Sequence, residues 1–427
     1  MSLSNLKTTF LLLIIFILAS CSPQTEQKEE PAFDASNLSD EELLAVADSL
    51  AQAFIMVDGH VDLPYRMKKK GFMITKEVED VSIETSGNFD HPKAKSGGLD
   101  APFMSIYVPS GYQETGGAKE FADSLIDMVS RLPVKFPSLF ALANSPSDIK
   151  ANFDNDLISL PMGMENGAPI EDDINNVKYF FERGIRYITL THSKDNQICD
   201  SSYDTTYTWN GVSPFGEEVI SEMNKWGIMV DISHVTDSAA FDALALTKAP
   251  VIASHSSCRK FTPGWERNMP DTLIKALAAN DGVIHINFGS NFLSQEISDN
   301  RDKMSEDLIN YRTENELASD DSAYVAYAKK YAEENEVYAD IQIVADHIDH
   351  VVNRVGIDYV GFGSDYDGVG DSLPKGMKDV STYPNLIAEL LKRGYSAEDI
   401  EKICYKNTFR VWNKVQEVAK ELQAGVS

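Results

Sequence analysis

The chain has 427 residues, of which 43% are hydrophobic and 24% are charged, and its formal net charge is −28 at pH 7. This composition is typical of a globular protein and excludes a largely disordered one. The negative charge argues against nucleic acid as a partner, because phosphate binding needs clustered Lys and Arg. The four cysteines include no Cys-x-x-Cys pair, which argues against a thiolate zinc site.

The first 20 residues have the pattern of a targeting segment. Lys7 precedes an apolar run from Phe10 to Ala19, which is too short to cross a bilayer but is typical of a signal peptide. Residues 18–21 resemble a bacterial lipobox, in which the cysteine, here Cys21, becomes lipid-modified; an ordinary signal peptide with an incidental cysteine is the alternative. We expect residues 1–20 to be removed, residues 21–38 to form a polar tether, and the protein to be an exported, membrane-anchored lipoprotein of a bacterial cell envelope.

The folded domain is expected to span residues 39–420. A capping box formed by Ser39 and Glu42 predicts a first helix that continues to about Phe54. Short β-rich runs then alternate with helical stretches. The runs are Phe54–Val57, Phe103–Val108, Leu157–Met162, Arg186–Leu190, Ile228–Ile232, Val251–Ala253, Gly282–Asn287 and Tyr359–Phe362. The expected helices are Ala118–Leu132, Glu171–Arg183, Phe215–Trp226, Asp237–Leu246, Asp271–Ala279 and Ala339–Val355.

Eight strands that alternate with helices predict an α/β fold, a (β/α)8 TIM barrel. A doubly wound open sheet is the alternative, but no G-x-G-x-x-G motif follows an early strand. Two long stretches, 68–98 and the charged segment 300–336, do not fit the plain repeat. We interpret them as additions to the barrel that could form a lid.

Histidines and carboxylates recur directly after the expected strands. The residues in these positions are His60, Asp62, Glu165, His192, His234, His255 and Asp365. Barrel enzymes carry their catalytic groups at this end of the strands, so the pattern predicts a metal site of a metal-dependent hydrolase. Imidazole together with carboxylate favours zinc, although manganese, cobalt and iron also fit. A Ser-His hydrolase is the alternative, but no G-x-S-x-G elbow is present.

Four further histidines lack this context. His91 and His285 follow no expected strand end, and His347 and His350 lie at i and i+3 on an expected helix, where we predict a solvated face.

At these motifs the sequence closely resembles the membrane (renal-type) dipeptidase family of zinc metallopeptidases. The matching segments are residues 58–62, 163–167, 189–193, 231–234, 254–257, 267–271, 361–368 and 383–391. They occur in order and span about residues 50–420. Segments 68–98 and 300–336 depart from the vertebrate members, which puts the substrate preference in doubt.

The resemblance implies two Zn²⁺ per chain and a role for each site residue. His60 and Asp62 would bind one zinc, His234 and His255 the other, and Glu165 would bridge the two. His192 would contact the substrate and polarise the scissile carbonyl, Arg267 would hold the substrate carboxylate, and Asp365 would transfer protons.

The expected activity is hydrolysis of dipeptides with a free C-terminal carboxylate, by a water activated between the two metal ions. Two alternatives are a barrel amidohydrolase that acts on acyl-amino acids or lactams, and an inactive metal-binding lipoprotein. The sequence leaves the oligomeric state open, a homodimer included.

Overall fold

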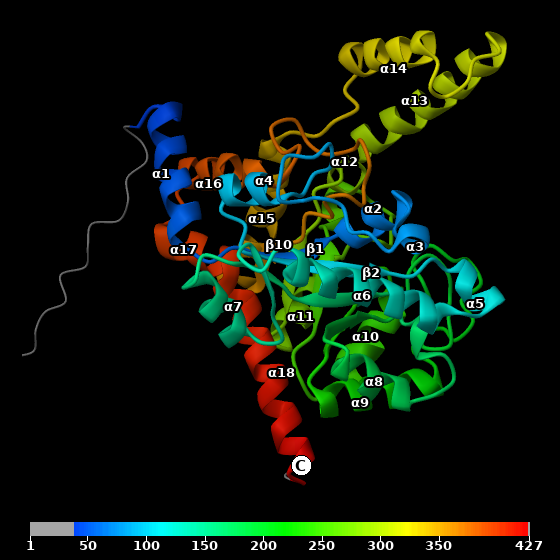
Figure 1. Cartoon of the computed structure of the whole chain (residues 1–427), viewed down its shortest axis with the longest axis vertical. Coiled ribbons are helices and arrows are strands. Elements are labelled where there is room, and N and C mark those ends of the chain that lie inside the picture. Colours follow the sequence, from blue (N-terminus) through cyan, green and yellow to red (C-terminus); the bar gives the residue numbers. More distant parts are fainter. Residues whose placement is uncertain (1–37, 426–427) are drawn as a thin grey trace, which may run out of the picture. The chain divides into compact units, whose positions relative to one another are not determined.

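Eight parallel strands close into a barrel in the computed structural model, which describes residues 38–425 (Figure 1). In order around the barrel the strands are β1 (Val57–Val61), β2 (Ala101–Tyr107), β5 (Met162–Glu165), β6 (Ile185–Thr189), β7 (Met229–Asp231), β8 (Ile252–Ser256), β9 (Val283–Ile286) and β10 (Val360–Phe362). Parallel pairing of Asp58 in β1 with Phe362 in β10 closes the ring. The predicted (β/α)8 barrel is confirmed.

The six helices expected between the strands are all present, with ends that differ by a few residues. They are α6 (Ala118–Lys135), α8 (Asn175–Glu182), α9 (Pro214–Trp226), α10 (Asp237–Leu246), α11 (Asp271–Ala279) and α15 (Ile341–Val355). Their apolar faces pack onto the outside of the barrel, because a parallel sheet of this kind must be covered by helices. A long C-terminal helix, α18 (Asn407–Gln423), completes the cover.

The first helix, α1 (Asp40–Ala53), begins as the sequence predicts. The Ser39 side chain accepts a hydrogen bond from the Glu42 backbone N–H, and the Glu42 carboxylate accepts one from the Ser39 backbone N–H at 2.8 Å. This helix packs against α16 (Tyr383–Lys392). Shorter helices complete the connections: α2 (Leu63–Lys69), α3 (Phe72–Thr75), α4 (His91–Gly97), α5 (Gly111–Thr115), α7 (Pro146–Phe153), α12 (Ser290–Leu293) and α17 (Ala397–Glu401).

The third expected strand, Leu157–Met162, is wrong as a barrel strand. Its residues instead form β4 (Ile158–Leu160), which pairs with β3 (Phe140–Leu142) in a separate two-stranded sheet. Pro161 follows directly and has no backbone N–H to continue the ladder, so the chain shifts there and the barrel strand β5 starts at Met162.

The first strand is also displaced from its prediction. The apolar run Phe54–Val57 predicts a strand that ends where β1 begins, at Val57. The strand itself reads Val-Asp-Gly-His-Val, and all five of these residues are buried. The polar residues of this strand are buried and hydrogen-bonded, Asp58 to the Tyr383 hydroxyl and His60 to the Tyr187 hydroxyl, so the apolar pattern alone misses them.

The segment 300–336 is mostly helical. Most of it lies in α13 (Gln295–Glu314) and α14 (Ser322–Glu334), which pack side by side through stacked rings of Tyr311 and Tyr327 with centroids 3.8 Å apart. Both helices extend beyond the helices around the barrel (yellow in Figure 1). Ile297 is the single buried residue of the two.

The solvated face predicted for His347 and His350 on α15 is wrong, because both side chains are buried. The Cys258 backbone N–H donates to His347 Nδ1 at 3.0 Å, and His350 Nε2 lies 2.7 Å from the Asp271 carboxylate. These partners satisfy the ring nitrogens inside the protein. His350 thus links α15 to the start of α11, and His347 links α15 to the loop after β8 and, at 3.0 Å from the Leu293 carbonyl, to α12.

Among residues 38–425, no helix has both the length and the apolar character that a membrane span requires. The expected signal peptide, the lipidation of Cys21 and nearly all of the expected tether lie outside the described residues.

Gly163 in β5 has no side chain and so leaves space for the ring of Tyr187 in β6. A Cβ atom at residue 163 would lie 1.9 Å from Cζ of Tyr187, which is far inside van der Waals contact. We therefore expect Gly163→Ala to lower the free energy of unfolding by about 1–3 kcal/mol, as overpacked cores do. Denaturant unfolding measures this loss. The matched control is Gly111→Ala, which meets no atom within 4 Å and should cost nothing; equal unfolding midpoints for the two variants would contradict the prediction.

Candidate metal centre

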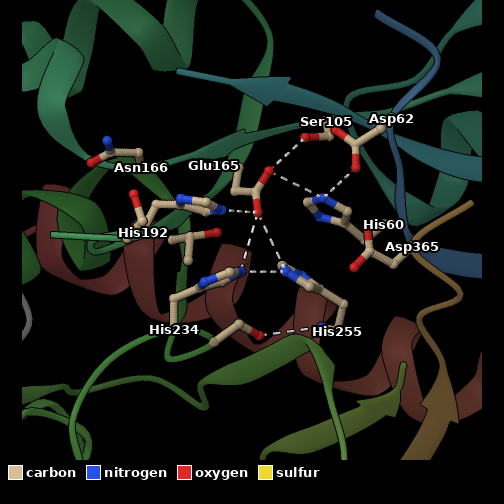
Figure 2. Close-up of polar contacts among 12 residues, drawn as sticks. His60, Asp62, Ser105, Glu165, Asn166, His192, His234, His255 and Asp365 are labelled. Atoms are coloured by element: carbon tan, nitrogen blue, oxygen red, sulfur yellow. Dashed lines mark hydrogen bonds and ion pairs between the residues drawn. The ribbon is translucent and has the colours of Figure 1, made fainter. Parts of the chain in front are cut away.

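The sequence-predicted site residues come together at one end of the barrel (Figure 2). Each lies at or just after the carboxyl end of a strand, and together they draw on six strands of the barrel. His60 is in β1 and Asp62 follows it; Glu165 ends β5; His192, His234 and Asp365 lie in the loops after β6, β7 and β10; His255 is in β8. The barrel topology therefore gathers side chains that are up to 305 residues apart in the chain.

Glu165 is the centre of the cluster. Its Oε1 atom lies 3.2 Å from His234 Nε2 and 3.4 Å from the Nε2 atoms of both His255 and His192. Its Oε2 atom lies 3.4 Å from His60 Nε2, on the opposite side. One carboxylate thus faces four imidazole rings, as the dashed lines in Figure 2 show.

The potential ligand atoms form three overlapping groups, and within each group all atoms lie within 4.8 Å of one another. They are His60, Glu165 and His255; Glu165, His192 and His234; and His60, Asp62 and Asp365. Glu165 belongs to two groups and His60 to two, so the set is continuous. All five residues expected to bind metal are among them, together with His192 and Asp365.

The donor atoms in this cluster fit a bound cation. His234 Nε2 and His255 Nε2 face each other at 2.8 Å, and two lone pairs at that distance repel unless a proton or cation attracts both. His60 Nε2 and Asp62 Oδ1 are buried and have no hydrogen-bond partner among the described residues. Buried polar atoms normally have a partner. Imidazole nitrogens and carboxylate oxygens are the donor types that zinc and similar metals take.

Hydrogen bonds behind the histidines turn the Nε2 atoms toward Glu165. His255 Nδ1 lies 2.8 Å from Ser254 Oγ, and the Ser254 hydroxyl donates to the Asp231 carboxylate at 2.6 Å. His60 Nδ1 lies 2.8 Å from the Tyr187 hydroxyl. Such contacts fix the orientation of ligand rings and raise their basicity.

Asp231 and Tyr187 were not identified from the sequence as parts of the site. Asp231 is an acid beside serines, and Tyr187 is one aromatic residue of a buried strand, so neither carried a distinguishing pattern. Ser254, which lies in the matching segment 254–257, supports His255.

Burial and charge set the protonation of the cluster. Burial lowers the pKa values of His234 and His255 well below the ordinary histidine value, and the nearby Arg267 charge lowers them further. Burial alone would raise the pKa of Glu165, but the surrounding histidines hold it well below its usual range. Neutral imidazole and ionised carboxylate are the forms that coordinate metal.

Two of the site residues have left-handed backbone conformations. The φ angles are 70° at His234 and 61° at Asp365, in a region that residues other than glycine rarely adopt. Conformations of this kind cluster at functional sites, where the surrounding structure holds them.

Asp365 and Asp367 have different surroundings. The Asp365 carboxylate accepts a hydrogen bond from Asn287 Nδ2 at 2.8 Å and faces His60 and Asp62. Burial, and then the charge of Asp62, raise the pKa of Asp365 well above its usual range. Asp367 instead pairs with Arg66 Nη1 at 2.6 Å and accepts from the Asn88 N–H at 2.7 Å, so it braces the loop.

A cavity of about 470 Å³ opens in front of the cluster. Its wall includes Asp62, His192 and Asp365. Arg267 is not part of this wall and is 2% exposed: Nη1 donates to Ser256 Oγ at 2.8 Å, and Nη2 donates to the His255 carbonyl at 2.7 Å. Its Nε atom is buried without a partner among the described residues.

Comparison with known proteins identifies the family. Residues 44–426 match the model of the membrane dipeptidase family (Peptidase family M19), so the chain belongs to this family. An uncharacterized dipeptidase of Schizosaccharomyces pombe is 30% identical over 382 residues, which are 86% of this chain and 83% of the relative. The resemblance inferred from the sequence motifs is confirmed.

Solved structures share the fold. The probable dipeptidase PvdM from Pseudomonas aeruginosa has a TM-score of 0.75 at 25% identity, covering 89% of this chain and 100% of that one. A metallo peptidase from Rhodobacter sphaeroides, liganded with a phosphinate mimic of the dipeptide L-Ala-D-Ala, has a TM-score of 0.66 at 21% identity over 85% of this chain and 99% of that one. The chain is thus a hydrolase of the metallo-dipeptidase class.

The convergence of the cluster on one carboxylate leads to a prediction on metal content. We expect His255→Ala to lower the metal bound per purified chain by half or more, because a ligand atom and its link to Ser254 are both lost. Elemental analysis after gel filtration measures the content. His91→Ala, which removes a histidine at the start of α4, is the control and should retain the wild-type metal content; equal metal in the two variants would contradict the assignment.

Proposed function

We propose that this protein is a zinc-dependent dipeptidase that hydrolyses dipeptides with a free C-terminal carboxylate. The observation that carries the proposal is the convergence of His60, His192, His234 and His255 on Glu165 at a barrel mouth. Membership of the dipeptidase family supports the substrate class. The dipeptide mimic bound by the Rhodobacter sphaeroides protein of the same fold gives further support.

Two zinc ions would be held by His60 and Asp62 on one side, by His234 and His255 on the other, and by Glu165 between them. When bound, zinc supplies a water of lowered pKa and polarises the substrate carbonyl. The hydrogen bonds that Ser254 makes with His255 and Tyr187 makes with His60 keep the Nε2 atoms of these histidines directed at the centre.

The chain's own groups supply the proton transfers and the binding contacts. His192, whose Nε2 faces Glu165 at the cavity wall, donates a hydrogen bond to the carbonyl oxygen as charge develops there. Asp365 accepts the proton of the attacking water and passes it to the leaving amine. Asn287 holds the Asp365 carboxylate in position through its 2.8 Å hydrogen bond.

A dipeptide panel tests this function together with the role of Asp365. Metal-free protein should be inactive, and zinc should restore hydrolysis of L,L- or L,D-dipeptides but not of acyl-amino acids or lactams. Asp365→Asn should keep the wild-type metal content while kcat falls about 10²–10⁴-fold, because general acid–base catalysis is lost. Asp367→Asn is the matched control and should mainly lower stability. Activity of metal-free protein would refute the proposed function, and near-normal kcat of Asp365→Asn would refute the assigned role.

Arg267 is proposed to hold the C-terminal carboxylate through its Nε, which has no partner among the described residues. Arg267→Ala should then cost about 1.5–3 kcal/mol in kcat/KM, the value of a charged hydrogen bond. The loss should be smaller for dipeptide amides, which lack the carboxylate. Steady-state kinetics on matched acids and amides measures the difference; an equal loss on both would mean that Arg267 only supports His234 and His255.

We also propose that the mature chain is anchored to a bacterial membrane by a lipid on Cys21. The pattern of residues 7–21 supports this localisation. Cys21→Ala should remove the lipid and shift exported protein to the soluble fraction, because lipid chains supply the membrane affinity. Fractionation and mass spectrometry of the N-terminus follow the change. Equal membrane retention of variant and wild type would contradict the anchor.

A further inference from the structure

A second arginine lies at the cavity in front of the metal centre. Arg301, in the second turn of α13, is part of the wall that also contains Asp62, His192 and Asp365. Arg267 is buried behind this wall. Arg301 is therefore the arginine whose side chain faces a ligand in the cavity directly.

The guanidinium of Arg301 has few partners. Its Nη1 donates to the Val337 carbonyl at 3.1 Å, and its Cζ lies 5.7 Å from the ring centroid of Tyr338. No carboxylate of the described residues lies within 4.0 Å of it. An arginine carries five N–H donors, so most of them remain free for a ligand. In a chain with 66 acidic and 38 basic residues, an arginine without a carboxylate partner beside a substrate cavity points to an anion.

The acidic side chain that contacts Tyr338 is already engaged. Asp371 accepts a hydrogen bond from the Tyr338 hydroxyl at 2.6 Å, and Lys378 Nζ lies 3.9 Å from its other oxygen. Lys378 also sits over the Tyr338 ring, 3.8 Å from the centroid. Two cations, Arg301 and Lys378, thus lie near one aromatic ring, and Asp371 pairs with Lys378 rather than with Arg301.

Two hydrogen bonds fix the position of Arg301 at the base of the segment 295–337, which contains α13 and α14 and which we call the α13–α14 excursion. Asn300 Nδ2 donates to the Glu336 carbonyl at 3.0 Å, next to the contact between Arg301 and Val337. These two hydrogen bonds join the outgoing chain at residues 300–301 to the returning chain at residues 336–337. A guanidinium held between two chain segments loses less conformational entropy when it binds a ligand.

The charge along the cavity is therefore uneven. Asp62, Glu165 and Asp365 lie at the barrel mouth, and Arg301 lies on the excursion. The carboxylate at the C-terminus of a dipeptide is assigned to Arg267 by the proposed function, on which this step rests. Arg301 is a further cation in the same cavity, and its natural counterpart is a second negative charge on the substrate.

We propose that Arg301 is a specificity-determining residue that binds the side-chain carboxylate of an acidic dipeptide, one that contains Asp or Glu. A forked guanidinium suits a carboxylate because two N–H groups can bond its two oxygens. The preferred substrates are then dipeptides with one acidic side chain, and their neutral isosteres bind less well.

Isosteric pairs of substrates test this assignment. With zinc-loaded full chain, kcat/KM is measured for Ala-Glu against Ala-Gln and for Glu-Ala against Gln-Ala. Wild type should favour the acidic member of at least one pair. Arg301→Gln should lower that acid-to-amide ratio by about ten-fold, the effect of losing one charged hydrogen bond. Arg312→Gln, which removes an arginine of the same helix outside the cavity wall, is the control and should keep the wild-type ratio.

The contrary results separate the assignment of Arg301 from the proposed function. Unchanged ratios in both pairs for Arg301→Gln overturn the assignment of Arg301 alone. An equal loss on Ala-Glu and Ala-Gln shows that Arg301 binds the C-terminal carboxylate common to both, and this also overturns it. Absence of turnover for every dipeptide by wild type overturns the proposed function and the inference with it. Thermal unfolding of both variants verifies that they are folded.

Discussion

The structure of the site depends on one constraint: a single buried carboxylate, Glu165, must satisfy four imidazole rings that come from four different strands or strand ends. Bringing these groups out of water is costly unless each charge and lone pair finds a counterpart. The barrel closes around the cluster, and its strands hold Glu165 and the four histidine rings at the distances that let them interact. Asp231, Ser254 and Tyr187 then act from behind, and their hydrogen bonds keep the rings from turning away.

This arrangement explains which parts of the molecule could be predicted from the sequence. The eight-fold alternation of strands and helices is regular, and His60, His234 and His255 each follow or end a β-rich run. Parallel strands bring their carboxyl ends to one side, so the position of these residues along the chain implied that they meet in space. The clustering of these side chains followed from the fold class, whereas their separate roles were implied by the resemblance to the dipeptidase family.

Features that depend on local detail could not be predicted in this way. The run Leu157–Met162 is apolar except for the buried Ser159, and the missing N–H of Pro161 divides it between two sheets. His347 and His350 look like residues of a solvated helix face until their partners on neighbouring elements are known. The left-handed backbone conformations of His234 and Asp365 could not be predicted from the residue types, because the surrounding fold imposes them.

The two hydrogen bonds that join residues 300–301 to residues 336–337 separate the excursion from the barrel. Apart from Ile297, α13 and α14 contribute no buried residue, so the barrel core does not depend on their sequence. Mutations can therefore accumulate in these helices, or the whole hairpin can be shortened or replaced, without displacing a strand or a ligand histidine. Evolution could in this way alter which peptides enter the cavity while the hydrolytic centre is inherited unchanged.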